Sequence, residues 1–308
     1  MNAAKKKEST PAGGSWPRLF SAPAIPAPRA TMAVVLTAVL VGGAYRAWHR
    51  WGPRITASDQ YLLQVEHVQI NPPPEWVRAD VRGEVVRDAG LEGRSILDRQ
   101  LTVTVAQAFL MHSWVEHVSH VRKHSHPPRV TVELRYRKPV AMVEVVLNQL
   151  PGLLPVDAEG VLLPPEDFSA QQTHDYLRIS VPHALPAGPV GTPWGQSQVH
   201  EAARIAALFE EHWKTCGFYR IQLTPSGTPD SNRIEPVFEL QSRKGAAIIW
   251  GRSPDLHDEA DAKAALAKVA AVLKHVQMHG SLATAPPGTH LDLRQATSHS
   301  ARTARVPP

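Results

Sequence analysis

The sequence of 308 residues contains a single cysteine, Cys216, so it can form neither an intrachain disulfide nor a cysteine-rich zinc site. It also lacks the Gly-x-Ser-x-Gly motif of a nucleophile elbow and a phosphate-binding loop that ends in Gly-Lys-Ser or Gly-Lys-Thr. A lone cysteine without a patterned His–Asp arrangement is more typical of a small buried side chain than of a nucleophile. These absences disfavour an enzyme, and we expect neither catalytic residues nor a cofactor.

Most of the chain also lacks an excess of positive charge. The full sequence has 33 Lys and Arg against 28 Asp and Glu, but residues 1–54 hold eight of the basic residues and only one of the acidic ones. The remaining residues carry 25 basic and 27 acidic groups. Because nucleic-acid binding needs concentrated Lys and Arg, this balance disfavours a nucleic-acid partner for the body of the protein. An apolar content of 43% excludes global disorder.

The N-terminal region combines a basic segment with an uncharged apolar one. Residues 1–29 are rich in Pro, Ala, Gly and Ser, which predicts a disordered basic tail. Residues 30–45 contain no charged side chain. We therefore expect a transmembrane helix over residues 30–48, with Trp48 and Trp51 at the interface.

A cleaved signal peptide is an alternative to a retained anchor, because Gly42 and Ala44 form a small-x-small pattern. The short basic tail and the large remainder favour a single-pass topology with a cytoplasmic N-terminus and most of the mass outside the cytoplasm. A linker over 49–60 is expected to follow the span.

Periodicity divides the remainder into two folded regions, and the first is expected over 61–145 as a β-α-α-β-β unit. Apolar residues recur at helical spacing twice, and the residues of 130–136 alternate between apolar and polar. The expected elements are a strand over 61–70, a helix from Pro74 that carries Val77, Val81 and Val85, a helix with Leu97, Leu101, Val105 and Phe109, and strands over 114–122 and 130–136.

The second region is expected over 146–295 as a mixed β domain with two helices, followed by a flexible tail over 296–308. A tight turn at Gly160 separates two apolar runs, since glycine tolerates positive φ. Acidic residues near the start of the long helix and a glycine at its end suit the helix dipole and the C-cap. The expected elements are a helix over 199–213, strands over 219–223, 237–240 and 246–250, a helix from Pro254 to Gly280 with Leu266, Val269, Leu273 and Val276 in the core, and a strand over 289–294.

Four segments in this order resemble the FtsQ/DivIB family of bacterial cell-division proteins. They are Trp114-Val115, the strand of 130–136 that leads into Lys138-Pro139-Val140-Ala141, Val156-Asp157 with Gly160-Val161, and Asp292-Leu293-Arg294. The resemblance covers most of residues 31–295. It implies an α+β fold with one transmembrane helix, a POTRA domain and a β domain.

The resemblance further implies a non-enzymatic scaffold at the division septum of the bacterial inner membrane. Its partners would be small bitopic divisome proteins like FtsB and FtsL, which the family contacts, together with other division proteins. They would bind by β-augmentation at the last strand. The corresponding partner-binding residues here are Leu291, Asp292, Leu293, Arg294, Gln295 and Ala296. The chain departs from the family after Arg294, because the residues that follow are poorer strand formers.

Two other functions remain open at this point. A POTRA-bearing adaptor for envelope protein assembly would share the first folded region. An exported metal-binding protein could use a histidine-rich hairpin, since imidazoles on one strand face can bind a divalent ion. The residues concerned are His112, His117, His120, His124 and His126. Because no carboxylate or cysteine is patterned with them, we expect a polar surface hairpin and no metal site there.

Overall fold

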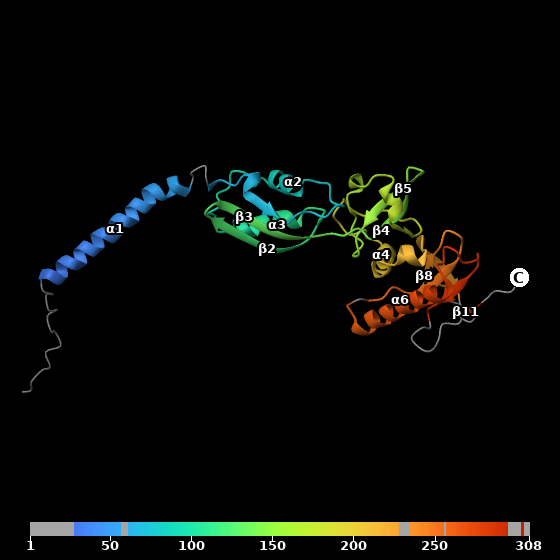
Figure 1. Cartoon of the computed structure of the whole chain (residues 1–308). Coiled ribbons are helices and arrows are strands. Elements are labelled where there is room, and N and C mark those ends of the chain that lie inside the picture. Colours follow the sequence, from blue (N-terminus) through green and yellow to red (C-terminus); the bar gives the residue numbers. More distant parts are fainter. Residues whose placement is uncertain (1–27, 57–60, 228–233, 256, 295–302, 305–308) are drawn as a thin grey trace, which may run out of the picture. The chain divides into compact units, whose positions relative to one another are not determined.

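The computed structural model describes residues 28–56, 61–227, 234–255, 257–294 and 303–304 (Figure 1). The chain has a mixed α/β fold with an N-terminal apolar helix and two β-sheets. It divides into two compact units, residues 1–58 and 59–308, and each is described separately. The predicted tail over 1–29 lies outside the described residues except for its last two, which are helical.

The first unit contains helix α1, Pro28–Thr56. Its segment Met32–Trp51 has 20 residues and a mean hydropathy of 1.2, so it is long and apolar enough to cross a membrane. The helix predicted over 30–48 is therefore present, but it continues to Thr56, and the predicted linker over 49–60 begins inside it. The apolar run ends at Arg46, but the helix continues through Arg50 and Arg54 because arginine is a good helix former.

The second unit begins with a three-stranded sheet in the order β1-β3-β2. β1 is Val68–Ile70 and lies parallel to β3, Pro128–Tyr136. β2, Val115–Ser125, pairs with β3 in antiparallel fashion. Helices α2, Val81–Asp88, and α3, Leu101–Leu110, come between β1 and β2 in the chain. The order of these elements is therefore β-α-α-β-β.

Alternation along β3 separates a core side from a solvent side. Val130, Val132 and Leu134 are buried, whereas Glu133 and Arg135 are exposed. The buried side packs with α2 and α3, whose Val85 and Phe109 belong to the same core, as does the fully buried Trp114 that precedes β2. One face of this sheet thus carries the helices, as predicted by the alternating pattern.

The predicted strand over 61–70 is wrong in its first half. The backbone N–H of Leu63 donates to the carbonyl of Arg94 at 2.8 Å, and the carbonyl of Leu63 accepts from Gly93 at 2.9 Å. Because a loop takes these backbone groups, the segment cannot join the sheet there. A 3₁₀ turn, η2 (Val65–His67), then precedes the three residues of β1.

Both predicted helices of this region also begin later than expected. α2 starts at Val81 instead of Pro74, because the carboxylate of Asp80 accepts from the N–H of Gly83 at 3.1 Å and caps the helix there. α3 starts at Leu101 instead of Leu97, after a turn in which Asp98 accepts from the N–H of Gln100 at 3.0 Å. The β-branched residues inside α3 do not prevent the helix, since its apolar face is buried.

The larger sheet has eight strands in the order β11-β10-β9-β8-β7-β6-β4-β5. Three of its pairings are parallel, namely β4 with β6, β6 with β7, and β9 with β10, and the others are antiparallel. The strands are β4 (Ala141–Leu147), β5 (Leu150–Val156), β6 (Leu177–Ser180), β7 (Arg220–Gly227), β8 (Ile234–Gln241), β9 (Ala247–Gly251), β10 (His290–Asp292) and β11 (Thr303–Ala304). β4 begins at Ala141 and pairs entirely within this sheet, ahead of the boundary that the sequence suggested at 145.

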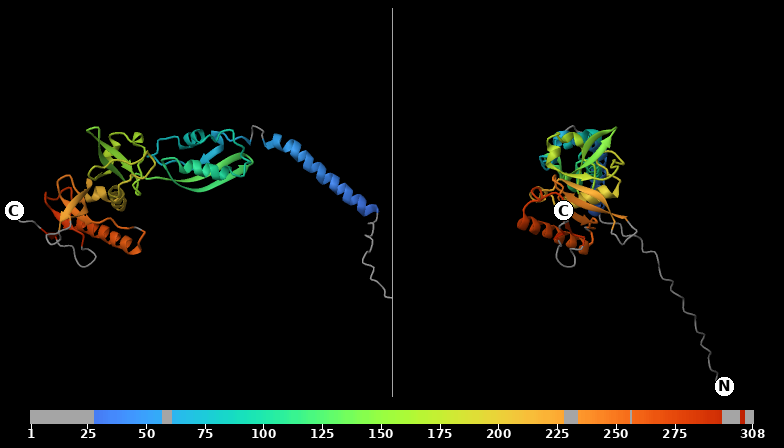
Figure 2. Two further views of the ribbon diagram at one scale, coloured as in Figure 1. Left: turned by 180° about the vertical axis from the view of Figure 1, so that it is seen from behind. Right: turned by 90° about the vertical axis from the view of Figure 1, so that its right-hand side faces the viewer.

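Three helices accompany this sheet, and each of them supplies residues to its core. They are α4 (Ser197–Leu208), α5 (Trp213–Cys216) and α6 (Glu259–His279), with the short 3₁₀ turns η3 (Pro165–Asp167) and η4 (Gln172–Asp175) in the proline-rich stretch. The helix predicted over 199–213 is thus divided at Leu208. In both views of Figure 2 the orange-red α6 lies against the orange strands of the sheet.

The start and the core stripe of α6 differ from the prediction. Asp258 caps the helix, since its carboxylate accepts from the N–H of Ala260 at 2.8 Å, so the helix begins at Glu259 instead of Pro254. Leu266, predicted to lie in the core, is 62% exposed. The buried positions are Ala265, Val269 and Val272, and the predicted Leu273 and Val276 pack against the same core as partly buried side chains.

Asp157 connects the end of β3 to the larger sheet. It is 2% exposed, and its carboxylate accepts from the Arg137 guanidinium at 2.6 Å and from the N–H of Val161 at 2.8 Å. Burial raises the pKa of Asp157, although the hydrogen bonds from Val161 and Arg137 oppose this shift. The predicted turn is present, and Gly160 has a φ of +70°. A Cβ at Gly160 would lie 2.9 Å from the backbone of His200, so the site needs glycine for space as well as conformation.

We predict that Asp157→Ala lowers the free energy of unfolding by about 3–5 kcal/mol, because it leaves the largely buried Arg137 charge without its partner. Urea denaturation of the full chain measures the change. The matched control is Asp88→Ala, which removes a pair whose side chains are 69% and 77% exposed and should change the stability little. Equal effects of the two substitutions would contradict this account of Asp157.

Candidate partner-binding edge

Strand β10 lies next to β9, and two backbone hydrogen bonds establish its orientation. The N–H of Ala247 donates to the carbonyl of Thr289 at 2.9 Å, and the N–H of Leu293 donates to the carbonyl of Ile249 at 2.9 Å. Backbone groups of alternate residues point to opposite edges of a strand. Odd-numbered residues of 289–293 therefore face β9, and the backbone groups of His290 and Asp292 face away from it.

The side chains of the predicted partner-binding residues separate into two sets. Leu291 and Leu293 are 3% and 0% exposed and belong to the core of the larger sheet. The side chains of Asp292 and Arg294 lie on the face of the sheet opposite the two leucines, where Arg294 is exposed and Asp292 is half-buried. The two leucines thus anchor the strand, whereas the polar pair is accessible from solvent. Gln295 and Ala296 lie outside the described residues.

Asp292 and Arg294 form a forked ion pair along this edge. The guanidinium of Arg294 donates to Asp292 through Nη2 at 2.6 Å and Nε at 3.0 Å, and the backbone N–H of Arg294 donates to Oδ1 at 2.9 Å. Burial acts to raise the pKa of Asp292, but these hydrogen bonds and the charges of Arg294 and Lys268 outweigh it and lower the pKa. A side chain of the strand itself therefore satisfies one amide near its end.

Lys268 of α6 adds a second positive charge beside this pair, which the sequence did not predict. Its Nζ donates to the carbonyl of Trp250 at 2.9 Å and lies 5.1 Å from the centre of the Trp250 ring. Burial lowers the pKa of Lys268, while Asp292 and Asp261 act in the opposite direction. Because Lys268 and Asp292 lie 24 positions apart, no local pattern could have linked them.

The outer neighbour of β10 is a segment of the same chain. β11, Thr303–Ala304, pairs with it in antiparallel fashion, with Ala304 opposite His290 and Thr303 opposite Leu291. The predicted flexible tail over 296–308 thus includes a two-residue strand, and the rest of the tail lies outside the described residues. The outward edge of β10 is thus paired with an antiparallel strand of its own chain at His290 and Leu291.

The opposite edge of the sheet, β5, is poorly suited to accept a strand. The carbonyl of Pro155 accepts from the N–H of Leu163 at 2.9 Å, so residues 151, 153 and 155 direct their backbone groups outward. Pro151 and Pro155 have no N–H, and the segment that includes Leu163 already occupies the end of the strand. Among the outward groups of these three residues, only Leu153 can donate. Proline at an edge strand discourages further pairing.

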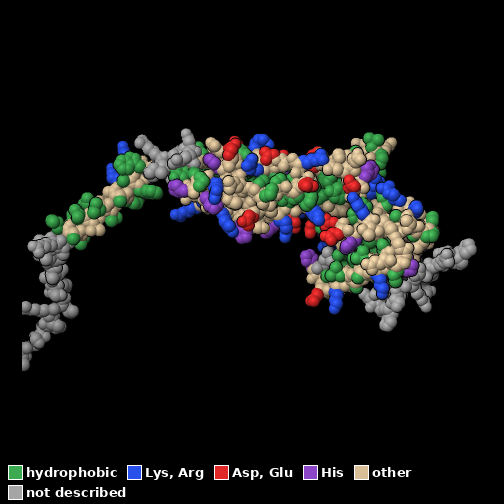
Figure 3. Space-filling model, viewed as in Figure 1, with side chains coloured by type: hydrophobic (Ala, Val, Ile, Leu, Met, Phe, Trp, Pro, Cys, Tyr) green, Lys and Arg blue, Asp and Glu red, His purple; other side chains and the backbone are tan. Residues whose placement is uncertain are grey.

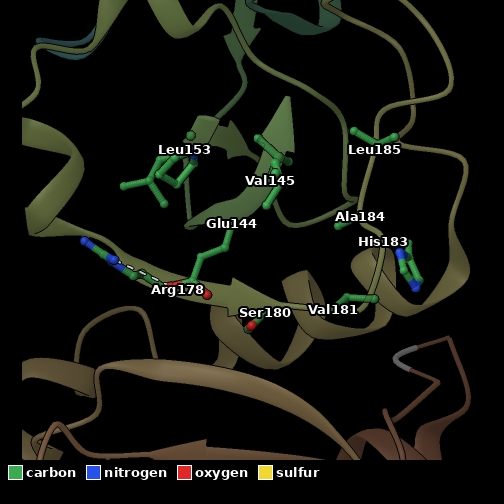
Figure 4. A pocket seen from close by; sticks show the side chains of 12 residues that line it. Glu144, Val145, Leu153, Arg178, Ser180, Val181, His183, Ala184 and Leu185 are labelled. Carbon is green, nitrogen blue, oxygen red and sulfur yellow. Dashed lines mark hydrogen bonds and ion pairs between the residues drawn. The ribbon is translucent and has the colours of Figure 1, made fainter. Parts of the chain in front are cut away.

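A hollow of 510 Å³ lies beside β4, which continues from Glu144 to Leu147 after its pairing with β6 has ended (Figure 4). Val145, Leu153 and Leu185 contribute apolar side chains to it. Its acidic residue, Glu144, lies 3.5 Å from Arg178 and 3.5 Å from Arg220. Both ion pairs engage the same carboxylate oxygen, Oε1, so two arginines occupy the charged group of this hollow.

The histidine-rich hairpin does not assemble a metal site within the described residues, where no group of three His, Cys, Asp or Glu side chains could hold an ion. His112 instead contacts Glu84 of α2 at 3.1 Å, away from the others. His120 contacts Glu133 at 3.1 Å. Each of these two imidazoles has a carboxylate partner of its own, so the metal-binding alternative has no geometric support here.

Cys216 is fully buried in the core of the larger sheet. Burial raises the pKa of its thiol to about 11, which keeps it protonated at neutral pH. A protonated, inaccessible thiol is a poor nucleophile, in agreement with the expectation from the sequence.

Comparison with known proteins gives no match, either to a protein-family model or to a curated protein.

We predict that Asp292→Ala accelerates hydrogen exchange at the amide of Arg294, because the hydrogen bond from this N–H to Asp292 Oδ1 is lost. Acid should have the same effect on the unsubstituted protein. Since the folded-state pKa of Asp292 is lowered, its contribution is present above the ordinary pKa of about 3.9 and is lost as the pH falls through the lowered value.

Amide exchange followed by mass spectrometry, corrected for the intrinsic effect of pH, measures both changes. Glu75→Ala, a substitution of an exposed residue in the smaller-sheet region, serves as the control and should leave this amide unchanged. Unchanged exchange in Asp292→Ala would show that the ion pair does not hold the strand end.

Proposed function

We propose that the protein is a non-enzymatic, single-pass scaffold of the septal cell-division machinery, similar to the FtsQ/DivIB proteins. In this proposal α1 crosses the bacterial inner membrane with its N-terminus in the cytoplasm, and residues 59–308 form the extracytoplasmic body. The partners are small bitopic divisome proteins like FtsB and FtsL. The outward edge of β10, which has the backbone groups of His290 and Asp292 and is paired only with the two residues of β11, carries the proposal.

Three features support the membrane topology and the domain assignment. The segment Met32–Trp51 meets the length and hydropathy required of a span. The β-α-α-β-β order, with β1 parallel to β3 and β2 on the other side of β3, is compatible with a POTRA domain that ends before β4 begins at Ala141. The turn at Asp157 and Gly160 coincides with the Val-Asp-x-x-Gly segment that the resemblance identified.

Binding through the edge follows from the backbone geometry of the two outer strands. A partner strand needs a row of N–H and C=O groups to pair with. β10 has such a row, paired so far only with β11, while prolines interrupt the row on β5. Because Leu291 and Leu293 hold β10 against the core, the accepting edge is rigid before the partner arrives. The partner strand would replace or extend β11, which forms only two residue pairs with β10.

Catalysis is not part of this proposal. The acidic residue of the hollow beside β4 is paired with two arginines, and the thiol of Cys216 is buried and protonated. The ion pairs engage the carboxylate, and the buried thiol is not accessible as a nucleophile.

We predict that His290→Pro prevents co-purification of the FtsB- and FtsL-like proteins from the same cells. Proline removes the outward N–H at this position while leaving the bonds to β9 intact, so the fold should be retained. The matched control, His290→Thr, keeps the N–H and should retain the partners. Equal recovery with both variants would rule out pairing at this edge.

A fluorescent fusion of the full chain is expected to concentrate at the septum of dividing cells. Deleting the chain from Leu291 onward should abolish partner capture while the three-stranded sheet stays folded, because the core of that sheet contains no residue beyond Phe168 in the described residues. A uniform envelope signal from the intact fusion would contradict the division role.

A further inference from the structure

The solvent side of the β2–β3 hairpin gathers histidine and arginine side chains. In the register of the hairpin His117 lies opposite Arg135, His120 opposite Glu133, and His124 opposite Arg129. Arg122 also lies on this side, opposite Thr131. We call the set of His117, His120, His124, Arg122, Arg129 and Arg135 the histidine–arginine face. Figure 3 shows purple and blue side chains close together over the region of these strands.

This face is turned away from the core that α2 and α3 share with the sheet. Val118 and Val121 point to the core side, where Lys123 also reaches the carbonyl of Asp98. The side chains of His120, Arg122 and Arg135 are 59%, 62% and 64% exposed. The face is therefore open to a ligand in solution or at a surface.

Two carboxylates offset part of the positive charge. Glu133 lies 3.1 Å from His120 and 3.8 Å from Arg122, and Glu116 lies 3.0 Å from Arg135. Three arginines against two glutamates leave one net positive charge while the imidazoles are neutral. Protonation of the three histidines raises it to four. The histidines thus determine whether the face is weakly or strongly cationic, and imidazole is the side chain that ordinarily changes charge between pH 5 and 8.

The covalent chain keeps Tyr61, the first described residue of the second unit, close to a bilayer if α1 spans it. Only residues 57–60 separate Thr56, the last residue of α1, from Tyr61. Four residues reach at most about 14 Å when fully extended. Bilayers with anionic phospholipids present negative headgroups, and the attraction of a basic group to them falls off within a Debye length of about 8–10 Å.

We propose that the histidine–arginine face binds anionic phospholipid headgroups when its histidines are protonated, so that mild acid draws the three-stranded sheet onto the bilayer. This inference rests on the proposed membrane span of α1 and is independent of the role in cell division. The headgroup phosphates supply the negative charge that the arginines and imidazolium groups complement. Glu133 and Glu116 keep the attraction weak at neutral pH.

The test uses the full chain in vesicles of phosphatidylcholine with or without phosphatidylglycerol, all containing a headgroup-labelled quencher lipid. A fluorophore on Ser119→Cys, an exposed position of β2, reports contact between the face and the bilayer. The native Cys216 stays unlabelled because it is buried and protonated. We expect quenching to rise from about pH 7.5 to about pH 5.5 only with phosphatidylglycerol, each added charge favouring contact about fivefold, and to disappear in high salt.

The triple variant His117→Gln, His120→Gln, His124→Gln should lose this response to pH. The matched control changes three exposed histidines elsewhere, His174→Gln, His257→Gln and His279→Gln, and should keep it. Retention of the response in the first variant, or an equal response without phosphatidylglycerol, would overturn the proposal. So would failure of the chain to enter the vesicles, which removes the anchoring premise, or a response to soluble polyphosphate but not to vesicles. Loss of septal localisation alone would leave it standing.

Discussion

The pairing of backbone groups at the two ends of the eight-stranded sheet constrains what the larger unit can do. Each outer strand presents one row of N–H and C=O groups that the sheet itself does not satisfy. On β5, Pro151 and Pro155 have no N–H, and the carbonyl of Pro155 already accepts a hydrogen bond from Leu163. At the other end β11 is the outermost strand, and it pairs with β10 through only two residues. The proposed scaffold function depends on a partner strand that replaces or extends β11 at this end.

Two charged side chains, Asp157 and Asp292, hold segments of the backbone in place through hydrogen bonds. The buried Asp157–Arg137 pair ties β3 to the larger sheet, although burial raises the pKa of the carboxyl and so opposes its ionisation. At the β10 edge, Asp292 holds the amide of Arg294, and Lys268 of α6 reaches the same region. Both sites use a charged side chain to fix backbone geometry, which is what an interaction through main-chain groups needs.

The sequence predicted the elements that depend on the spacing of nearby apolar residues or on the conformation of a single glycine. The alternation of β3, the turn at Gly160 and the end of α6 at Gly280 all follow from side-chain period or glycine conformation. Some errors arise from local caps and turns that the periodicity did not reveal, as at Asp80 and Asp258. Others arise from distant residues: the loop at Arg94 pairs with the backbone of Leu63 and shortens β1. The pairing partner of an edge strand is likewise a long-range property, so β11 could not be predicted from its own residues.

Residue-resolved amide exchange on the complex with the FtsB- and FtsL-like partners would test the central claim most directly. The amides of residues 290–293 form two sets by direction: those of His290 and Asp292 face away from β9, and those of Leu291 and Leu293 face it. The account predicts that partner binding slows exchange at the outward pair and leaves the inward pair nearly unchanged. Protection confined to β5 or to the three-stranded sheet, with no change at His290 and Asp292, would contradict it.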